Sequence, residues 1–275
     1  EEDLIRTVTT AYAAGWRHVK LYFMCGLPTE TDDDVLQIAS MAKEVIKAGR
    51  EASGRRDIKC TVSIGGFVPK PHTPFQWASQ LDHESTDARL AKLKDAIRSD
   101  REYGKAIGLR YHDGKPGIVE GLLSRGDRRI ARVIEQAWRA GARFDGWSEH
   151  FSFDRWMECA QSALSDDEVD VDWFTTRERD RTEVLPWEHL DSGLDIDWLW
   201  DDWQDALEEI AVDDCRWTPC FDCGVCDQMD THIQVGPTGV TELPMPGIGV
   251  PSCATPLATT TQSVTRQDAS KTNGG

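Results

Sequence analysis

Over the first 67 residues, the pattern of apolar and polar positions switches between helix-like and strand-like segments. A helical pattern covers residues 3–14. The nearly continuous apolar run VKLYFMC, residues 19–25, is typical of a strand buried on both faces of a parallel sheet. A second helical pattern begins at Thr31, a suitable N-cap, and ends at Gly49. Residues 60–67, CTVSIGGF, then indicate another strand. This order of helix, strand, helix and strand predicts an α/β fold with parallel strands.

Helical periodicity dominates the middle of the chain. Four further helices are predicted. The first follows Thr86 and has Leu90, Leu93, Ile97 and Ile107 on its apolar face. The second begins at Asp127, the third begins at Ser152, and the fourth follows Asp195. Residues 231–275 contain no aromatic side chain and are rich in Thr, Ser, Gly and Pro, so we expect a disordered tail there.

Charge divides the chain near residue 150. The 275 residues carry a net charge of −17, but residues 151–230 alone hold 24 of the 48 acidic and 5 of the 31 basic side chains, with seven of the 11 Trp. We therefore expect four parts: 1–82, an α/β part; 83–150, a helical connection; 151–230, an acidic Trp-rich helical module; and the tail. The acidity argues against a nucleic-acid backbone as partner and leaves a basic protein partner open. No apolar run is long enough for a membrane helix, so we expect a cytoplasmic protein without a membrane partner.

Two loop segments follow the predicted strands. The first, LYFMCGLPTET at residues 21–31, resembles the turn after the fifth barrel strand of radical S-adenosylmethionine (radical SAM) enzymes, and the second, GFVPKPHTPFQW at residues 66–77, resembles the stretch after their sixth strand. The resemblance implies a SAM-binding region. By this resemblance, Gly26, Pro28 and Glu30 would shape the SAM pocket. Phe67 and Val68 would flank the adenine.

The resemblance extends over residues 1–230. Together with FDGWSEHF at residues 144–151 and the cluster that begins DCRW, the loops are similar to the C-terminal half of a family of radical SAM proteins with a cobalamin-binding domain. The family's C-x3-C-x2-C motif, which binds the SAM-cleaving [4Fe–4S] cluster, is absent. We therefore expect a fragment that is inactive alone and holds the last β/α units of a partial radical SAM-type barrel, followed by a mainly helical C-terminal extension. The full-length enzyme would generate a 5′-deoxyadenosyl radical, with cobalamin bound by a missing N-terminal domain and with an unknown substrate.

Four cysteines lie within twelve positions of the acidic module. They have the spacing C-x4-C-x2-C-x2-C: Cys215, Cys220, Cys223 and Cys226. Two-residue gaps let successive thiolates face one metal site, and four thiolates suit either an iron–sulfur cluster or a tetrahedral zinc ion. The close spacing favours iron–sulfur over zinc, and a loop of free thiols is the alternative to both.

Several other residues have both a functional and a structural interpretation. His72 could contact a substrate or pack in its loop, and Glu149 with His150 could act as an acid/base pair or cap the helix that follows. The acidic run at residues 166–172 suggests a cation site but lacks the EF-hand pattern, which favours a solvated loop. The stripe of Trp198, Trp200 and Trp203 could be a carbohydrate or partner platform, but Trp200 and Trp203 have the spacing of core residues, so Trp198 is the better candidate for a surface position.

Two other classes of function remain open at this point. One is a non-catalytic, metal-stabilised acidic module that binds a basic partner. The other is a complete α/β protein whose GLPTET turn binds a phosphate or nucleotide, although no P-loop pattern supports it.

Overall fold

The computed structural model describes residues 1–231, so the tail predicted at 231–275 lies, except for its first residue, outside the described residues. Three strands form one parallel sheet in the order β1-β2-β3: β1 at His18–Cys25, β2 at Lys59–Gly66 and β3 at Ile107–Tyr111. The described strands make an open sheet rather than a closed barrel. Two of them match the predicted strands, and the parallel order matches the predicted α/β class.

The third strand is a correction to the sequence analysis. Ile107 was expected on the helix that begins near Thr86, but that helix, α3, spans His83–Ser99 and Ile107 begins β3. The helix ends because the Asp100 carboxylate accepts the backbone N–H groups of Glu102 and Tyr103, which turns the chain. A short 3-10 helix, η2 at Gly104–Ala106, then leads into the strand.

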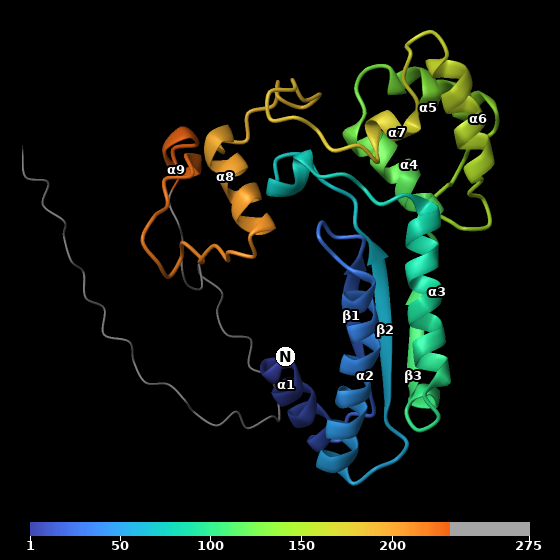
Figure 1. Ribbon diagram of the computed structural model, residues 1–275, viewed down its shortest axis with the longest axis vertical. Helices are drawn as coiled ribbons and strands as arrows, with labels where there is room; N and C mark the ends of the chain where they lie inside the picture. Colours follow the sequence, from blue (N-terminus) through green and yellow to red (C-terminus); the bar gives the residue numbers. More distant parts are fainter. Residues whose placement is uncertain (232–275) are drawn as a thin grey trace, which may run out of the picture. The chain divides into compact units, whose positions relative to one another are not determined.

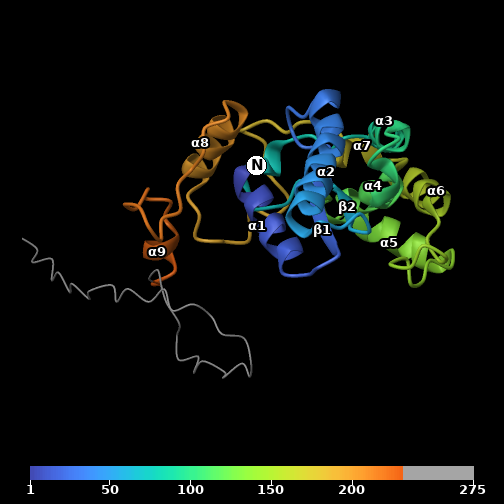
Figure 2. The same cartoon turned by 90° about the horizontal axis from the view of Figure 1, so that it is seen from below.

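Helices α1 (Glu2–Ala13), α2 (Asp32–Ser53) and α3 pack on one face of this sheet, and α2 runs alongside β1 and β2 (Figures 1 and 2). The predicted N-cap of α2 is confirmed, since Thr31 and Asp34 form a reciprocal capping box. Its predicted end at Gly49 is wrong, because α2 continues to a left-handed cap at Gly54. Gly49 instead allows close packing: a Cβ there would lie 2.5 Å from the ring of Tyr12.

Only one face of the sheet is covered by the described residues. The covered face is apolar, with registered rows of side chains from the three strands: Val19, Cys60 and Ile107; Leu21, Val62 and Leu109; Phe23, Ile64 and Tyr111. On the other face Tyr22 is 74% exposed and Met24 is 52% exposed. The expectation that the first strand is buried on both faces is therefore wrong for these residues. We call this second surface the open face.

All the remaining helices except α9 contribute to two further apolar clusters. Their bounds are η1 Pro74–Trp77, α4 Gly114–Arg125, α5 Ile130–Arg139, α6 Phe153–Leu164, α7 Val171–Phe174, α8 Ile196–Leu207 and α9 Val225–Gln228. One cluster joins α4, α5, α6 and α7, so it continues across residue 150, where composition suggested a boundary. The other joins Trp77 of η1 to Trp187 and to Trp203 of α8.

The predicted starts of two of these helices are confirmed, since Ser152 caps α6 and Asp195 caps α8. Among the helices that the structure describes, none has the length and apolar character needed to cross a bilayer.

Candidate functional site

The turn after β1 is held by one carboxylate. The backbone N–H of Gly26, which has a φ of 94°, donates to Oε2 of Glu30 over 2.6 Å. The same oxygen accepts from Nη1 of Arg89 on α3 over 2.8 Å, and the Glu30 side chain is only 8% exposed. A carboxylate bonded both to a backbone amide and to a guanidinium is strongly oriented. Glu30 therefore ties the β1–α2 turn to α3, and we call this arrangement the Glu30 latch.

The other residues assigned to the SAM pocket pack mostly within the protein. Gly26 faces Leu81, whose Cβ would lie 3.3 Å from a Cβ on the glycine, and Pro28 is half-buried. Phe67 and Val68 are buried, and the ring of Phe67 meets that of Phe75 edge to face at 5.5 Å. These side chains consequently form the wall behind the loops and not an exposed binding surface.

Open backbone is found immediately before them, at the carboxyl end of β2. A Cβ on Gly65 or Gly66 would meet no atom within 4 Å, so a flat group could approach the main chain there. Gly65 is paired in register with Met24 of β1, which is exposed on the open face. The sequence analysis did not single out these glycines, although their position at the end of an apolar strand is the signal that could have found them.

The open face is polar farther from these glycines, toward the amino ends of the strands. Nε2 of His18 lies 2.8 Å from Oγ1 of Thr61, and the Lys20 ammonium lies 5.6 Å from the ring centroid of Tyr22. Arg110 of β3 is in register with Ser63 of β2 on the same face and is exposed. In parallel sheets ligands bind at the carboxyl ends of the strands. This face and its carboxyl edge therefore form the candidate site.

The two strand cysteines are packed as small apolar side chains, as expected from their positions. Cys25 and Cys60 are both buried. Burial raises the pKa of the Cys60 thiol to about 12. Burial, and then the charge of Glu30, raise that of the Cys25 thiol to about 12. Neither thiol is therefore a nucleophile at neutral pH.

The four-cysteine cluster lies in a loop fixed to the start of α8. The backbone N–H of Asp195 donates to the carbonyl of Cys223 over 2.9 Å, and the ring of Phe221 stacks on Trp198 at 6.4 Å. The Sγ of Cys220 accepts the N–H of Asp222 over 3.3 Å. Gly224, directly after Cys223, has a φ of 90°, which favours glycine. A backbone N–H bonded to sulfur and a left-handed glycine after the second Cys of C-x2-C both suit thiolates around a metal.

The four thiols do not form a closed centre in the described structure. Burial raises the pKa of the Cys226 thiol, and the charges of Cys220, Cys223 and Cys215 raise it further. No three His, Cys, Asp or Glu side chains among residues 1–231 converge in an arrangement that holds a metal ion. The donor set fits a thiolate-bound metal, and the loop has to tighten for all four sulfurs to share one.

The weaker candidates lie apart from one another and mostly have structural partners. The backbone N–H of His72 donates to Oε1 of Gln76 over 3.2 Å, and the same oxygen accepts from the indole of Trp187 over 2.7 Å. Glu149 and His150 are both exposed. The side-chain cap of the helix that follows them is supplied by Ser152.

Two further candidates are placed by the structure. In the acidic run, Asp170 caps α7. Trp198 stacks on Phe221 and packs against the apolar cluster of Trp77, Trp187 and Trp203. It is therefore half-buried and less exposed than expected.

Comparison with known proteins leaves the family of the chain unassigned. No family model matches it, and no solved structure matches it. An uncharacterized protein of Methanocaldococcus jannaschii, MJ0966, is 29% identical over 135 residues. The match covers 49% of this chain and 27% of the relative, so the chain matches about a quarter of that protein's length.

Proposed function

We propose that the chain supplies the last β/α units of a radical SAM enzyme. The observation that carries this proposal is the one-sided sheet. Parallel sheets of doubly wound folds have both faces covered by helices. Here three parallel strands have helices on one face and a polar, glycine-containing open face on the other. A barrel has this asymmetry, because its helices lie outside and its inner face meets other strands and carries the site at the carboxyl edge.

The residues have the following roles in this proposal. The Glu30 latch keeps the turn from Gly26 to Glu30, including Pro28, in one shape at the edge of the site. The adenine of SAM lies against the main chain at Gly65 and Gly66, with Phe67 and Val68 as the apolar wall behind it. SAM bound next to a reduced iron–sulfur cluster supplies radical chemistry, the removal of a hydrogen atom from a substrate. No residue of this chain is assigned to cobalamin, which a separate domain of the whole protein would bind.

The cysteine cluster is the second part of the proposal. Cys215, Cys220, Cys223 and Cys226 hold an iron–sulfur cluster, with zinc as the alternative occupant. The N–H···S bond to Cys220 and the left-handed Gly224 support thiolate ligation. Attachment of the loop to α8 through Asp195 and Cys223 makes the centre part of the acidic module.

The test of the SAM site uses the complete polypeptide in which this chain occurs. It is expected to contain C-x3-C-x2-C, to bind radiolabelled SAM in equilibrium dialysis and to release 5′-deoxyadenosine with dithionite. Gly65→Val should weaken SAM binding at least about 10-fold, because the added side chain projects from the open backbone. Gly54→Asn is the control, at the left-handed cap where α2 ends. A polypeptide without the motif, or one that neither binds SAM nor forms 5′-deoxyadenosine, would refute the proposal.

The test of the metal site is independent of SAM. Anaerobic reconstitution of this chain with iron and sulfide should give the broad visible absorption of an iron–sulfur cluster and acid-labile sulfide. Both signals should disappear in Cys223→Ser and persist in Cys159→Ser, which changes a buried thiol of α6. Stoichiometric zinc without iron in protein purified under anaerobic conditions would assign zinc instead. Absence of any bound metal would reject the site.

A further inference from the structure

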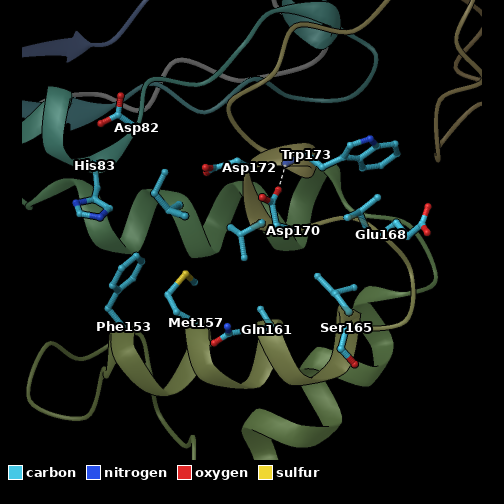
Figure 3. Close-up of a pocket in the computed structure, with 15 residues that line it drawn as sticks. Asp82, His83, Phe153, Met157, Gln161, Ser165, Glu168, Asp170, Asp172 and Trp173 are labelled. Carbon is cyan, nitrogen blue, oxygen red and sulfur yellow. Dashed lines mark hydrogen bonds between the residues drawn. The ribbon is translucent and has the colours of Figure 1, made fainter.

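A groove of about 880 Å³ lies in the helical part of the chain (Figure 3), and none of its lining residues belongs to a strand of the sheet. Its floor is α6, and the opposite side is formed by the start of α3, by α4 and by the segment that contains α7. Its lining residues are Asp82, His83, Ile118, Phe153, Met157, Ala160, Gln161, Leu164, Ser165, Glu168, Val169, Asp170, Val171, Asp172 and Trp173. No role is assigned to this groove by the proposed function.

The floor of the groove follows α6 for its full length. Phe153, Met157 and Leu164 recur on one side of the helix, and Figure 3 shows Phe153, Met157, Gln161 and Ser165 in a row along it. From Phe153 to Leu164 the helix rises about 17 Å, or three turns. An apolar trough of this length matches the face of a second helix that offers anchors at positions i, i+4 and i+7.

Carboxylates dominate the rim of the groove. Glu168, Asp170 and Asp172 come from the segment that contains α7 and form no ion pair with any described residue. Asp82, just before α3, lies on the same side of the groove, across from α6, and accepts from the backbone N–H and the hydroxyl of Ser85. The side opposite α6 therefore presents four negative charges above an apolar floor.

The cations that border the groove are already engaged with aromatic rings. The Lys115 ammonium lies 5.5 Å from the ring centroid of Phe153. The guanidinium groups of Arg129 and Arg177 lie 4.8 and 4.1 Å from that of Trp173. Arg129 is also paired with Asp127, and Arg177 with Glu183. The carboxylates of the rim consequently keep their charge for a partner.

We propose that this groove binds a basic amphipathic helix, about three turns long, that belongs to another protein. Its apolar face lies along α6 over Phe153, Met157 and Leu164, and its Lys or Arg side chains meet Glu168, Asp170 and Asp172. An anionic lipid surface is repelled by the same carboxylates. The proposal is separate from the SAM site, because its residues and those of the open face do not overlap.

The experiment uses the 275-residue chain and a fluorescent 14-residue helical peptide of Leu and Lys with one apolar face. Fluorescence anisotropy should give micromolar binding that weakens at least about fivefold between 50 and 300 mM salt, because exposed charge pairs are screened. A scrambled peptide of the same composition has no apolar face, and a Leu/Glu peptide has the opposite charge. Both should bind at least about 10-fold more weakly. Equal binding of the scrambled peptide would mean that charge alone drives the interaction and would overturn the proposal.

Two charge-reversal variants separate the groove from the general acidity of the module. Asp172→Lys changes the rim and should weaken peptide binding at least about fivefold. Asp201→Lys reverses one charge on α8, outside the groove, and should change binding less than twofold. Circular dichroism checks that both variants remain folded. Equal losses in the two variants, or no binding by the unchanged chain at 50 mM salt, would reject the groove as the site.

Methionine oxidation gives a position-specific measurement. Saturating peptide should slow the oxidation of Met157 by hydrogen peroxide, followed by mass spectrometry, at least about threefold, because the peptide covers the groove floor. Met24 and Met229 are exposed elsewhere and should oxidise at the same rate with and without peptide. Protection of all three methionines, or of none, would contradict binding in the groove.

Discussion

Replacing Arg89 by Met tests whether the Glu30 latch positions the edge of the candidate site. The substitution removes the guanidinium whose Nη1 lies 2.8 Å from Oε2 of Glu30 and keeps an apolar stem of similar length. The Glu30 carboxylate then retains one described partner, the N–H of Gly26 at 2.6 Å. Because its side chain is 8% exposed, water replaces the lost guanidinium poorly.

The expected magnitude follows from burial. Removing one partner of a buried ion pair costs about 3–5 kcal/mol, mainly because the remaining charge stays buried without compensation. Arg89 is 20% exposed and Glu30 keeps its amide bond, so we expect a loss of about 2–4 kcal/mol in the free energy of unfolding. Glu30→Gln removes the charge and should cost less, about 1–2 kcal/mol. The double variant should be more stable than the sum of the two losses implies, with a coupling of about 1–2 kcal/mol.

Urea unfolding followed by circular dichroism measures these losses, and hydrogen exchange at the Gly26 amide gives a local readout. Exchange at Gly26 should accelerate more than exchange in α1, since the latch bonds that amide directly. Arg55→Met is the matched control, because Arg55 and Asp57 form an exposed pair and its loss should leave the free energy of unfolding nearly unchanged. If Arg89→Met costs no more than Arg55→Met, or leaves exchange at Gly26 unchanged, the latch does not hold the turn.

Three further predictions concern packing, thiol reactivity and pH. Gly49→Ala should destabilise the chain by about 1–3 kcal/mol in urea unfolding, because the new Cβ lies 2.5 Å from a buried ring, whereas Gly117→Ala on α4 meets its nearest atom at 3.6 Å and should be neutral or stabilising. Iodoacetamide at pH 8 should alkylate exposed Cys220 in the metal-free chain and spare Cys25, whose pKa is about 12, as peptide mapping would show. Hydrogen bonding to the Arg177 guanidinium lowers the pKa of Glu183 below its ordinary 4.5. The stability that this Arg177–Glu183 pair contributes is therefore present above pH 4.5 and is lost as the pH falls through the lower pKa of the folded state. Unfolding of Glu183→Gln should therefore depend less on pH below about 5, and an unchanged profile would remove this pair as the cause.

Local signals in the sequence predicted much of the first 67 residues. Thr31 and its first-turn carboxylates define the start of α2 by capping alone, which does not depend on the rest of the fold. The end of α2 required tertiary information. Gly49 resembles a stop signal in sequence, but it lies where α2 packs against the ring of Tyr12, and only a glycine fits there.

Longer-range features were not predictable from one sequence. Ile107 fits the helical period of the preceding residues, and only the Asx turn at Asp100 and the pairing with Cys60 place it on a strand. The open face was missed for a related reason. The run VKLYFMC is apolar at nearly every position, so composition cannot show that Tyr22 and Met24 are exposed while Leu21 is buried. Phe67 and Val68, predicted to flank the adenine, are buried, and the open backbone lies one or two residues before Phe67, at Gly65 and Gly66.

The uneven charge of the chain bears on the basic-helix groove proposed for its helical part. Residues 151–230 contain 24 acidic and 5 basic side chains, so pairing within this segment leaves most of its carboxylates without a cation. Self-repulsion of this kind destabilises a compact state, and it is reduced when cations bind. A basic helix along α6 would bring positive charge to this segment, whereas a four-thiolate zinc or iron–sulfur centre at Cys215–Cys226 carries a net negative charge and would not. The acidity is therefore better explained as a property of a segment that folds with partners than as a solubility device, and the α/β part, which is nearly neutral, has no such requirement.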